Sequence, residues 1–476
     1  MTETKHKSVI TEVVANDLCI GCGTCAAVCP RHSLSVAFNQ YGEYTARMEA
    51  DACPHGCRLC LSVCPFFETQ ANEDVLGEDL FGGDADIQHT PETGYYLDAF
   101  VGHTNVAGRR RRSASGGLAT WLLETLLREN RVDYVICVSA TADSDKRFQF
   151  TVCRTAEEVR AGAGSCYYPV EMSGILQHIA AHEGRYAVIA LPCFCKAIRL
   201  AMKRLGVLQQ RIAYVLGLVC GQAKSAFFAE YACALGGGDP HRLNRVEFRV
   251  KDPDRPASDY GLKFVSGAAD SKQQEGIVFQ TQGVSQAWGR RYFTPTACGF
   301  CDDVFAEAAD ACFMDAWLPR YARDWQGHSI LLVRQRQILE LVRACAKDRS
   351  VTCRPLPIRE VIASQRSGLR SKRGDIRHRI RIARRARRVV PAKRLAKCTV
   401  RLCLVRKRLV QVQSLVSQQS RRQWVESAKD LSRFVEAMAP CEKRLRRLQF
   451  LWKIGRVPGA VLRRLRNRLR DRRPPA

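Results

Sequence analysis

Eight cysteines near the N-terminus fall into two runs, and their spacing suits iron–sulfur chemistry. The first run comprises Cys19, Cys22, Cys25 and Cys29 followed by Pro30, and the second comprises Cys53, Cys57, Cys60 and Cys64 followed by Pro65. In the bacterial ferredoxin spacing, three cysteines of a run bind one 4Fe–4S cluster and the fourth binds the other. We therefore expect two clusters, each transferring single electrons. Their ligands are expected to be Cys19, Cys22, Cys25 and Cys64 for one, and Cys29, Cys53, Cys57 and Cys60 for the other.

Two other roles for these cysteines fit the sequence less well. A zinc ribbon binds its metal through two Cys-x2-Cys pairs, not through triplets followed by Cys-Pro. A disulfide framework requires an oxidising compartment, and the N-terminal residues lead into no apolar segment that directs export. The spacing between Cys53 and Cys57 is one residue longer than usual, which makes Cys53 the least regular of the eight.

The composition describes an ordinary globular protein with a basic tail. The formal net charge is +28, yet residues 366–476 contain 35 Lys and Arg against 6 Asp and Glu. The rest of the chain is therefore close to neutral. No apolar stretch approaches the ~18 residues of a membrane span. We expect a cytoplasmic protein, either free or attached to the inner face of the membrane.

Four segments differ in composition, and together they predict an α+β protein. Residues 1–70 form the ferredoxin-type domain, the acidic residues 71–93 a linker, residues 94–365 an α/β domain, and residues 366–476 a mostly helical, Arg-rich tail. Apolar runs predict strands at 133–139, 186–191, 212–219 and 329–333. Helical periodicity predicts helices at 118–128, 170–182, 195–205 and 223–235.

Four further cysteines could hold a third cluster. Cys193 and Cys220 follow two predicted strands, and ligand sites in open α/β sheets lie beyond such carboxyl ends. Cys298 and Cys301 form a Cys-x2-Cys pair, which also suits a redox dithiol or half of a zinc site. Cys195 competes with Cys193, and a buried apolar role for single cysteines stays open at this stage.

Two Gly-rich segments precede predicted helices. Residues 113–120 read SASGGLAT and directly follow four arginines, Arg109 to Arg112. Free N–H groups at a helix start suit a phosphate or another anion, although an ordinary capped helix explains the segment equally well. The second segment, residues 161–169, contains Ser165 and is equally ambiguous.

Six motifs in order resemble the coenzyme F420 hydrogenase/dehydrogenase family of beta subunits, in its bacterial branch with an N-terminal two-cluster ferredoxin domain. They read SASGGLAT, AGAGSCYYPVE, IALPCFCKAIRL, LGLVCGQAKS, CGFCDDVFAEAAD and DWQGHSILLVR. The resemblance implies an FAD site at Ser115, Gly116, Gly117 and Thr120, with Ser165 beside them. It also implies a third 4Fe–4S cluster on Cys193, Cys220, Cys298 and Cys301.

Two departures from the family pattern leave the substrate open. Cys166 stands where many members carry a basic residue, and residues 313–319 replace a Gly-Asp ending. The resemblance implies an FAD- and iron–sulfur-dependent oxidoreductase that passes electrons between a one-electron donor and a two-electron substrate. The same branch suggests a link to polysaccharide biosynthesis. The alternative is a non-catalytic subunit that feeds electrons to a partner enzyme. Asp302 and Asp303 are the candidate proton donors.

The basic tail predicts a docking role. Arginine-rich helices bind anionic lipid headgroups, nucleic acid or acidic proteins. Aromatic residues are sparse in the basic runs, and no nucleic-acid motif is present, which disfavours nucleic acid. We expect a redox partner (ferredoxin or a partner enzyme subunit), and the tail to face it or an anionic membrane. A solvated appendage is the simpler alternative.

Overall fold

The computed structural model describes residues 7–49, 53, 56–67, 71–143, 146–268, 273–345, 349–394 and 401–454. Its centre is an eight-stranded mixed sheet in the order β15-β5-β14-β13-β9-β8-β6-β7. Its strands are β5 (Asp98–Thr104), β6 (Tyr134–Ala140), β7 (Phe148–Cys153), β8 (Tyr186–Ala190), β9 (Ile212–Leu218), β13 (Ala311–Asp315), β14 (Ser329–Val333) and β15 (Val351–Pro355). β6, β8, β9 and β13 run parallel, and β5 shares their direction because β14 pairs antiparallel with both β5 and β13. The carboxyl ends of these strands therefore meet at one edge, the usual place for a ligand site.

Helices cover both faces of this sheet, as the strand sequences require. Every residue of β8 and of β14 is buried, and continuous apolar runs of this kind are typical of strands without an exposed face. One face packs against α5 (Leu118–Arg128) and α13 (Arg336–Cys345), and the other against α7 (Ser173–Ala181), α8 (Pro192–Met202) and α9 (Gly206–Arg211). The predicted strands and helices all occur, with ends shifted by up to four residues.

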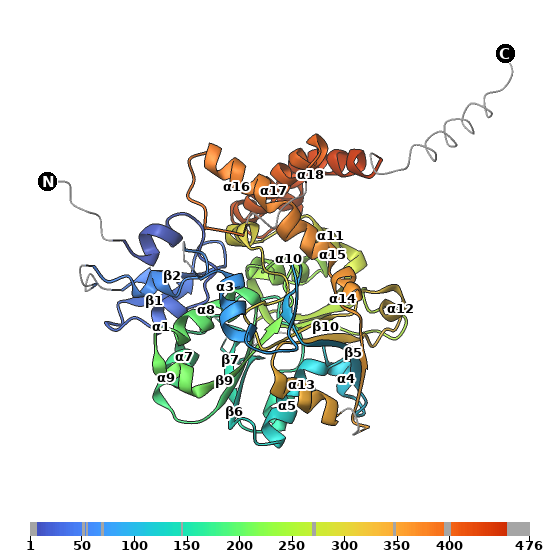
Figure 1. Ribbon diagram of the computed structural model, residues 1–476. Coiled ribbons are helices and arrows are strands. Elements are labelled where there is room, and N and C mark those ends of the chain that lie inside the picture. The colour runs from blue at the N-terminus through green and yellow to red at the C-terminus, as the bar shows by residue number, and fades with distance from the viewer. Residues whose placement is uncertain are drawn as a thin grey trace, which may run out of the picture.

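The described part of the N-terminal module, residues 7–49, 53 and 56–67, packs directly on the sheet domain at α7 and α8 (Figure 1). It contains the π-helix η1 (Ile10–Val14), α1 (Thr24–Ala27), α2 (Leu59–Ser62) and the hairpin of β1 (Leu34–Phe38) and β2 (Tyr44–Met48). The Met172 N–H donates to the Cys22 carbonyl at 3.0 Å. A Cβ atom on Gly23 would lie 2.8 Å from the Ser173 nitrogen, so glycine permits this close approach.

The segment expected to be a linker is folded. It contains α3 (Glu73–Phe81), whose N-terminus is capped by the Asn72 side chain, and β3 (Gln88–Thr90), which pairs with β4 (Gly94–Tyr96). Glu73 is buried, and its carboxylate lies 3.3 Å from Lys196 Nζ of α8. Glu73, one of the acidic residues that suggested a linker, thus supplies a negative charge that pairs with Lys196 inside the protein.

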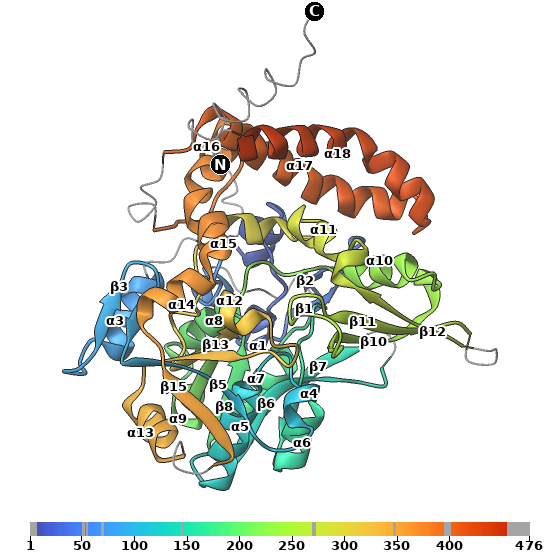
Figure 2. The same cartoon turned by 90° about the vertical axis from the view of Figure 1, so that its right-hand side faces the viewer.

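A second, three-stranded sheet carries the end of the tail. It consists of β10 (Leu243–Val250), β11 (Gly261–Ser266) and β12 (Gln274–Phe279), and it shares an apolar core with α10 (Phe227–Leu235) and α11 (Val284–Gly289). The antiparallel helices α17 (Leu404–Glu426) and α18 (Leu431–Ile454) close this core from above with Trp424, Phe434 and Met438 (Figure 2). The described part of the tail is therefore helical, as predicted, but packed on the body.

The first part of the tail follows α14 (Ile358–Ser364) and packs against residues 296–300 and α17. Its elements are α15 (Arg366–Leu369), the π-helix η5 (Arg370–Gly374) and α16 (Ile376–Arg385). No helix among the described residues is both long and apolar enough to cross a membrane.

A buried charge network fastens the tail to the body. Arg394 is 4% exposed, and its guanidinium lies 3.1 Å from Asp302 and 2.7 Å from Glu307. It also lies 3.6 Å from Glu73. Burial raises the pKa of the Glu73 carboxyl, but the charges of Lys196 and Arg394 outweigh it and hold this pKa well below its usual range. We call Glu73, Asp302 and Glu307 the carboxylate cluster.

Removing the Arg394 charge should destabilise the protein strongly. Arg394→Met removes the cation that all three carboxylates share, and we expect a loss of about 3–5 kcal/mol in the free energy of unfolding, measured by urea denaturation. Lys203→Met is the matched control, because the Lys203–Asp79 pair is 43% and 49% exposed and should contribute about 0–1 kcal/mol. Equal losses in both variants contradict the role of the network.

Candidate functional site

The N-terminal module brings the first predicted set of four thiols together. Cys19, Cys22, Cys25 and Cys64 line one small cavity. Gly21 and Gly23 have φ of 67° and 80°, and a Cβ atom on Gly21 would overlap the Tyr44 carbonyl. These glycines allow the backbone to curve tightly around the thiols. Burial and the charges of the neighbouring thiols raise the pKa of Cys25, so an apolar shell surrounds this set.

The second predicted set also converges. Burial and the charges of Cys57 and Cys29 raise the pKa of Cys53. The pKa of Cys60 is raised by burial and by Cys53 and Cys57. Despite the longer spacing after Cys53, its thiol lies close enough to Cys57 and Cys29 for their charges to act on it. The binding of one cluster by these four thiols stays a prediction.

A third thiol set forms at the carboxyl edge of the central sheet. It comprises Cys193, Cys220, Cys298 and Cys301. Cys193 lies in the first turn of α8 directly after β8, and Cys220 follows β9. Cys298 lies in the 3₁₀-helix η4 (Thr296–Phe300), and its sulfur accepts the Ala223 N–H at 3.3 Å.

The four thiols lie close enough for their charges to influence one another. Burial raises the pKa of Cys193 well above its ordinary value, and the charges of the other three thiols raise it further. Burial also raises the pKa of Cys220 to about 12. Thiolates in such a site require compensating positive charge, which metal ligation supplies.

Cys195 is excluded from this set by its position. Its side chain is fully buried, and its sulfur contacts the Ala190 and Leu216 carbonyl oxygens at 3.5 and 3.6 Å. Two residues along a helix point to roughly opposite sides, so the Cys195 sulfur faces away from the side that carries Cys193. The choice of Cys193 as the ligand stays a prediction.

Asp302 and Asp303 contribute to packing in this structure. Asp302 pairs with Arg394, and one carboxylate oxygen of Asp303 accepts the Glu307 N–H at 3.0 Å. Burial and the Glu307 charge raise the pKa of Asp303 to about 7. Both side chains are buried, so neither faces an open cavity from which a substrate takes a proton.

The main cavity has a volume of about 620 Å³ and opens beside the start of α5. Gly117 and Thr120, two of the predicted cofactor residues, line it. The other lining residues come from the end of β5, α4 (Arg109–Arg112), α5 and α6 (Ala156–Ala161); among them are Thr104, Val106, Arg109, Arg112, Trp121, Glu124, Glu157, Arg160 and Ala163. This volume lies within the range of small-molecule and cofactor sites.

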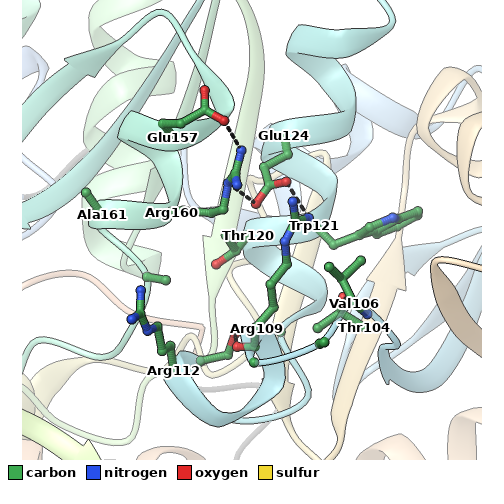
Figure 3. A pocket seen from close by; sticks show the side chains of 15 residues that line it. Thr104, Val106, Arg109, Arg112, Thr120, Trp121, Glu124, Glu157, Arg160 and Ala161 are labelled. Atoms are coloured by element: carbon green, nitrogen blue, oxygen red, sulfur yellow. Dashed lines mark hydrogen bonds and ion pairs between the residues drawn. The ribbon is translucent and has the colours of Figure 1, made fainter.

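Cations and apolar groups share the wall of the main cavity. Figure 3 shows Arg109 and Arg160 reaching the buried Glu124 from two sides, at 2.7 and 3.5 Å. Burial raises the pKa of Glu124 against the influence of both arginines. Arg112 reaches the wall from α4, and Trp121 adds a large apolar surface. The cavity thus combines a helix start and an arginine with apolar walls, which fits a phosphate-bearing aromatic cofactor.

The other predicted cofactor residues lie behind this wall or beyond it. Ser115 donates to the His328 carbonyl at 2.6 Å and belongs to a smaller neighbouring pocket. A Cβ atom on Gly116 would overlap the Gly102 carbonyl, so Gly116 serves close packing on β5. Ser165 is half-buried in its loop and is not among the residues that line the main cavity.

Lys251 fixes the Gly-rich segment, and the sequence gives no signal for it. Its Nζ atom donates to the carbonyls of Arg110 and Ser115, both at 2.7 Å, and to that of Gln326 at 2.5 Å. Burial and the nearby Arg249 and Arg110 lower the pKa of Lys251 to about 7. Three carbonyl acceptors nevertheless match the three protons of an ammonium, so we assign the charged form.

Two family models match most of the central region. Residues 99–177 match the N-terminal part of the beta subunit of coenzyme F420 hydrogenase/dehydrogenase, and residues 183–358 match its C-terminal part. Together these matches cover more than half of the 476 residues. Residues 12–70 match a 4Fe–4S dicluster domain.

Curated relatives are similar at lower identity. One subunit of the F(420)H(2) dehydrogenase of Methanosarcina mazei is 24% identical over 218 residues, which cover 44% of this chain and 55% of the relative. A coenzyme F420-dependent sulfite reductase of Methanocaldococcus jannaschii is 23% identical over 357 residues, covering 70% and 47%. The chain thus spans about half the length of these two relatives.

An uncharacterized ferredoxin of Methanocaldococcus jannaschii is 38% identical over 53 residues, covering 11% of this chain and 66% of the ferredoxin. A chain in the structure of the F420-reducing [NiFe] hydrogenase complex of Methanosarcina barkeri aligns with a TM-score of 0.47 at 15% identity. That alignment covers 62% of this chain and 96% of the other.

Gly117 should be difficult to replace. Its φ is 85°, and a Cβ atom would lie 2.8 Å from Ser113 Oγ and 2.9 Å from Thr104 Cγ2. We expect Gly117→Ala to lower the free energy of unfolding by about 1–3 kcal/mol, because left-handed backbone strains a side chain. Gly174→Ala in α7 is the control, since nothing lies within 4 Å of its Cβ position, and a helix gains up to about 1 kcal/mol from this change. Differential scanning calorimetry measures both, and a neutral Gly117→Ala argues against the assigned strain.

Proposed function

The chain belongs to the coenzyme F420 hydrogenase/dehydrogenase family of beta subunits, and on this premise we propose that it is an iron–sulfur flavoprotein oxidoreductase. Electrons enter as single electrons through the N-terminal module and leave as pairs at the main cavity, or take the reverse route. An iron–sulfur redox role agrees with the family and with the dicluster match at residues 12–70. The flavin, the third cluster and the substrate class are the proposed parts.

The convergence of the third thiol set carries this proposal. Cys301 belongs to the same buried core as Cys22, Cys25 and Cys64 of the N-terminal module. The set also lies at the carboxyl edge of the sheet, where β5 ends in Thr104 on the wall of the main cavity. Thiols in this position suit a relay between the module and a cofactor in the cavity.

The residues of the main cavity have separate tasks in this proposal. The start of α5 at Gly117 and the Arg112 guanidinium bind the pyrophosphate of FAD, because both present positive charge to it. Trp121 and Val106 supply apolar surface and exclude water. Lys251 holds the Gly-rich segment in place from behind through its three carbonyl contacts. When bound, a flavin couples one-electron and two-electron chemistry.

The substrate is proposed only as a two-electron organic molecule. Relatives carry coenzyme F420 in their names, so a reduced deazaflavin is the first candidate to test. Cys166, at the family's usual basic position, is half-buried, and its sulfur contacts the Tyr168 carbonyl at 3.7 Å. It therefore adds no charge that binds a phosphorylated deazaflavin. The link to polysaccharide biosynthesis stays a prediction.

A non-catalytic electron-transfer subunit is the second candidate function. The name of one relative describes a subunit, and α18 presents a basic face that suits an acidic protein partner. Its exposed members are Lys443, Arg444, Arg446, Arg447 and Lys453. An anionic membrane surface offers the same complementary charge, so lipid vesicles are the comparison in a binding experiment.

Anaerobic purification with iron, sulfide and flavin analysis tests the proposal. We expect about twelve irons per chain, four for each cluster, and one flavin. Reduction by reduced ferredoxin, NAD(P)H or reduced deazaflavin then identifies the donor. A flavin-free protein that accepts electrons supports the subunit role, and about eight irons contradict the third cluster.

The variants Cys193→Ala and Cys195→Ala show which of the two cysteines binds the third cluster and which belongs to the apolar core. Cys193→Ala should lose about four irons per chain, because a 4Fe–4S cluster needs four thiolates. Cys195→Ala removes only a buried sulfur and should retain about twelve. Iron quantification after anaerobic purification gives the result, and the opposite pattern assigns Cys195 as the ligand.

Arg112→Ala should weaken flavin binding. A charged hydrogen bond to phosphate is worth about 1.5–3 kcal/mol, so the dissociation constant for FAD should rise about 10- to 100-fold. Arg128→Ala, at the far end of α5, is the control, because Arg128 is exposed and pairs with Glu129. Fluorescence titration of deflavinated protein with FAD measures both, and equal affinities argue against a pyrophosphate at Arg112.

A further inference from the structure

The third thiol set receives a lysine from the tail. Lys372 lies in η5 and is 2% exposed. Its Nζ atom is 3.0 Å from Cys301 Sγ and 2.6 Å from the Asp303 carbonyl oxygen. Lys372 follows the last residue matched by the family models, residue 358, so the family match does not assign it.

Neighbouring contacts hold Lys372 in this position. Arg373 donates to the Asp302 carbonyl at 3.0 Å and binds the Glu307 carboxylate. Arg379 of α16 donates to the Ser371 carbonyl at 2.7 Å and reaches the Gly299 carbonyl at 3.5 Å. The tail therefore wraps around the Cys298–Cys301 segment on both sides of Lys372.

The charge of Lys372 requires an anion at this place. A buried ammonium is costly unless it is paired, and the two hydrogen-bond acceptors of its Nζ atom are a neutral carbonyl and the Cys301 sulfur. Of these two contacts, the Cys301 sulfur is the one that carries negative charge when it ligates a cluster. Arg291 adds a second buried cation beside Cys298, and Asp303 is the carboxylate that faces the set.

We propose that Lys372 is a positioning residue of the third cluster, which donates a hydrogen bond to the Cys301 sulfur and raises the cluster's reduction potential. This inference rests on the third cluster of the proposed function. Net charge and hydrogen bonds to sulfur set the potentials of such clusters. A reduced cluster carries one more negative charge than the oxidised form, so a fixed ammonium stabilises the reduced form.

The tail then has a role in redox chemistry beyond docking. With a single buried charge, the tail raises the reduction potential of the cluster that receives electrons from the N-terminal module.

Lys372→Met tests the proposal in the anaerobically purified full chain. The change removes the charge and keeps the length. In an EPR-monitored redox titration, we expect the equilibrium constant for reducing the third cluster to fall about tenfold, which is about 59 mV for one electron. The potentials of the two N-terminal clusters should not change. Lys372→Arg should restore most of the wild-type potential.

Lys429→Met is the matched control for a lost tail charge. Lys429 lies in the turn between α17 and α18 and pairs with Glu230 at 3.0 Å, and its replacement should leave all potentials unchanged. Twelve irons with an unaltered potential in Lys372→Met overturn the inference and leave the proposed function intact. If the wild-type protein contains only about eight irons per chain, it has no third cluster. Both the third cluster of the proposed function and the role of Lys372 are then overturned.

A measurement on the wild-type protein covers the case in which Lys372→Met loses iron. Pulsed EPR of the reduced protein labelled with ¹⁵N-lysine should show a hyperfine coupling from one lysine nitrogen, and Lys372→Arg should abolish it. Absence of this coupling at the third cluster overturns the inference.

Discussion

The buried carboxylates Glu73, Asp302 and Glu307 can lie inside this protein only because cations from elsewhere in the chain reach them. Their partners are Lys196 of α8, together with Arg373 and Arg394 of the tail. An unpaired buried charge costs several kcal/mol, so the two chain segments that contribute carboxylates, α8 and the tail must adopt their places together. The third thiol set lies within this arrangement, since Asp302 directly follows Cys301.

The same constraint explains why the sequence predicts some parts of the molecule well and others poorly. β8 and β14 are continuous apolar runs, and a cysteine directly after such a strand points to the functional edge of the sheet. The family resemblance, confirmed by the models for residues 99–177 and 183–358, rests on motifs at that edge. Such patterns can be recognised in the sequence because the residues that determine the local structure lie within a few positions of one another.

Long-range charge pairing leaves no such local pattern. Residues 71–93 appear as an acidic linker and residues 366–476 as a basic appendage, although Glu73 and Arg394 meet in the interior. Within a run of many arginines, Lys372 is indistinguishable from a solvated residue. Neighbours in the Gly-rich segment also have different surroundings, which the motif does not reveal. Gly117 and Thr120 face the main cavity. Ser115 contacts the His328 carbonyl before β14, and Gly116 packs against β5. Residues that are adjacent in the motif therefore point to opposite sides of one turn, some into the cavity and others into the packed interior.

The late position of Arg394 in the chain has a consequence for biosynthesis. Domains fold as they emerge from the ribosome, N-terminal first. Cys301 emerges well before Lys372, Arg373 and Arg394, so the nascent chain displays the third thiol set before the tail covers it. Synthesis of residues 372–394 then covers the four thiols. The order of residues thus leaves these thiols accessible for a limited period, which ends once Arg394 has joined the buried carboxylates.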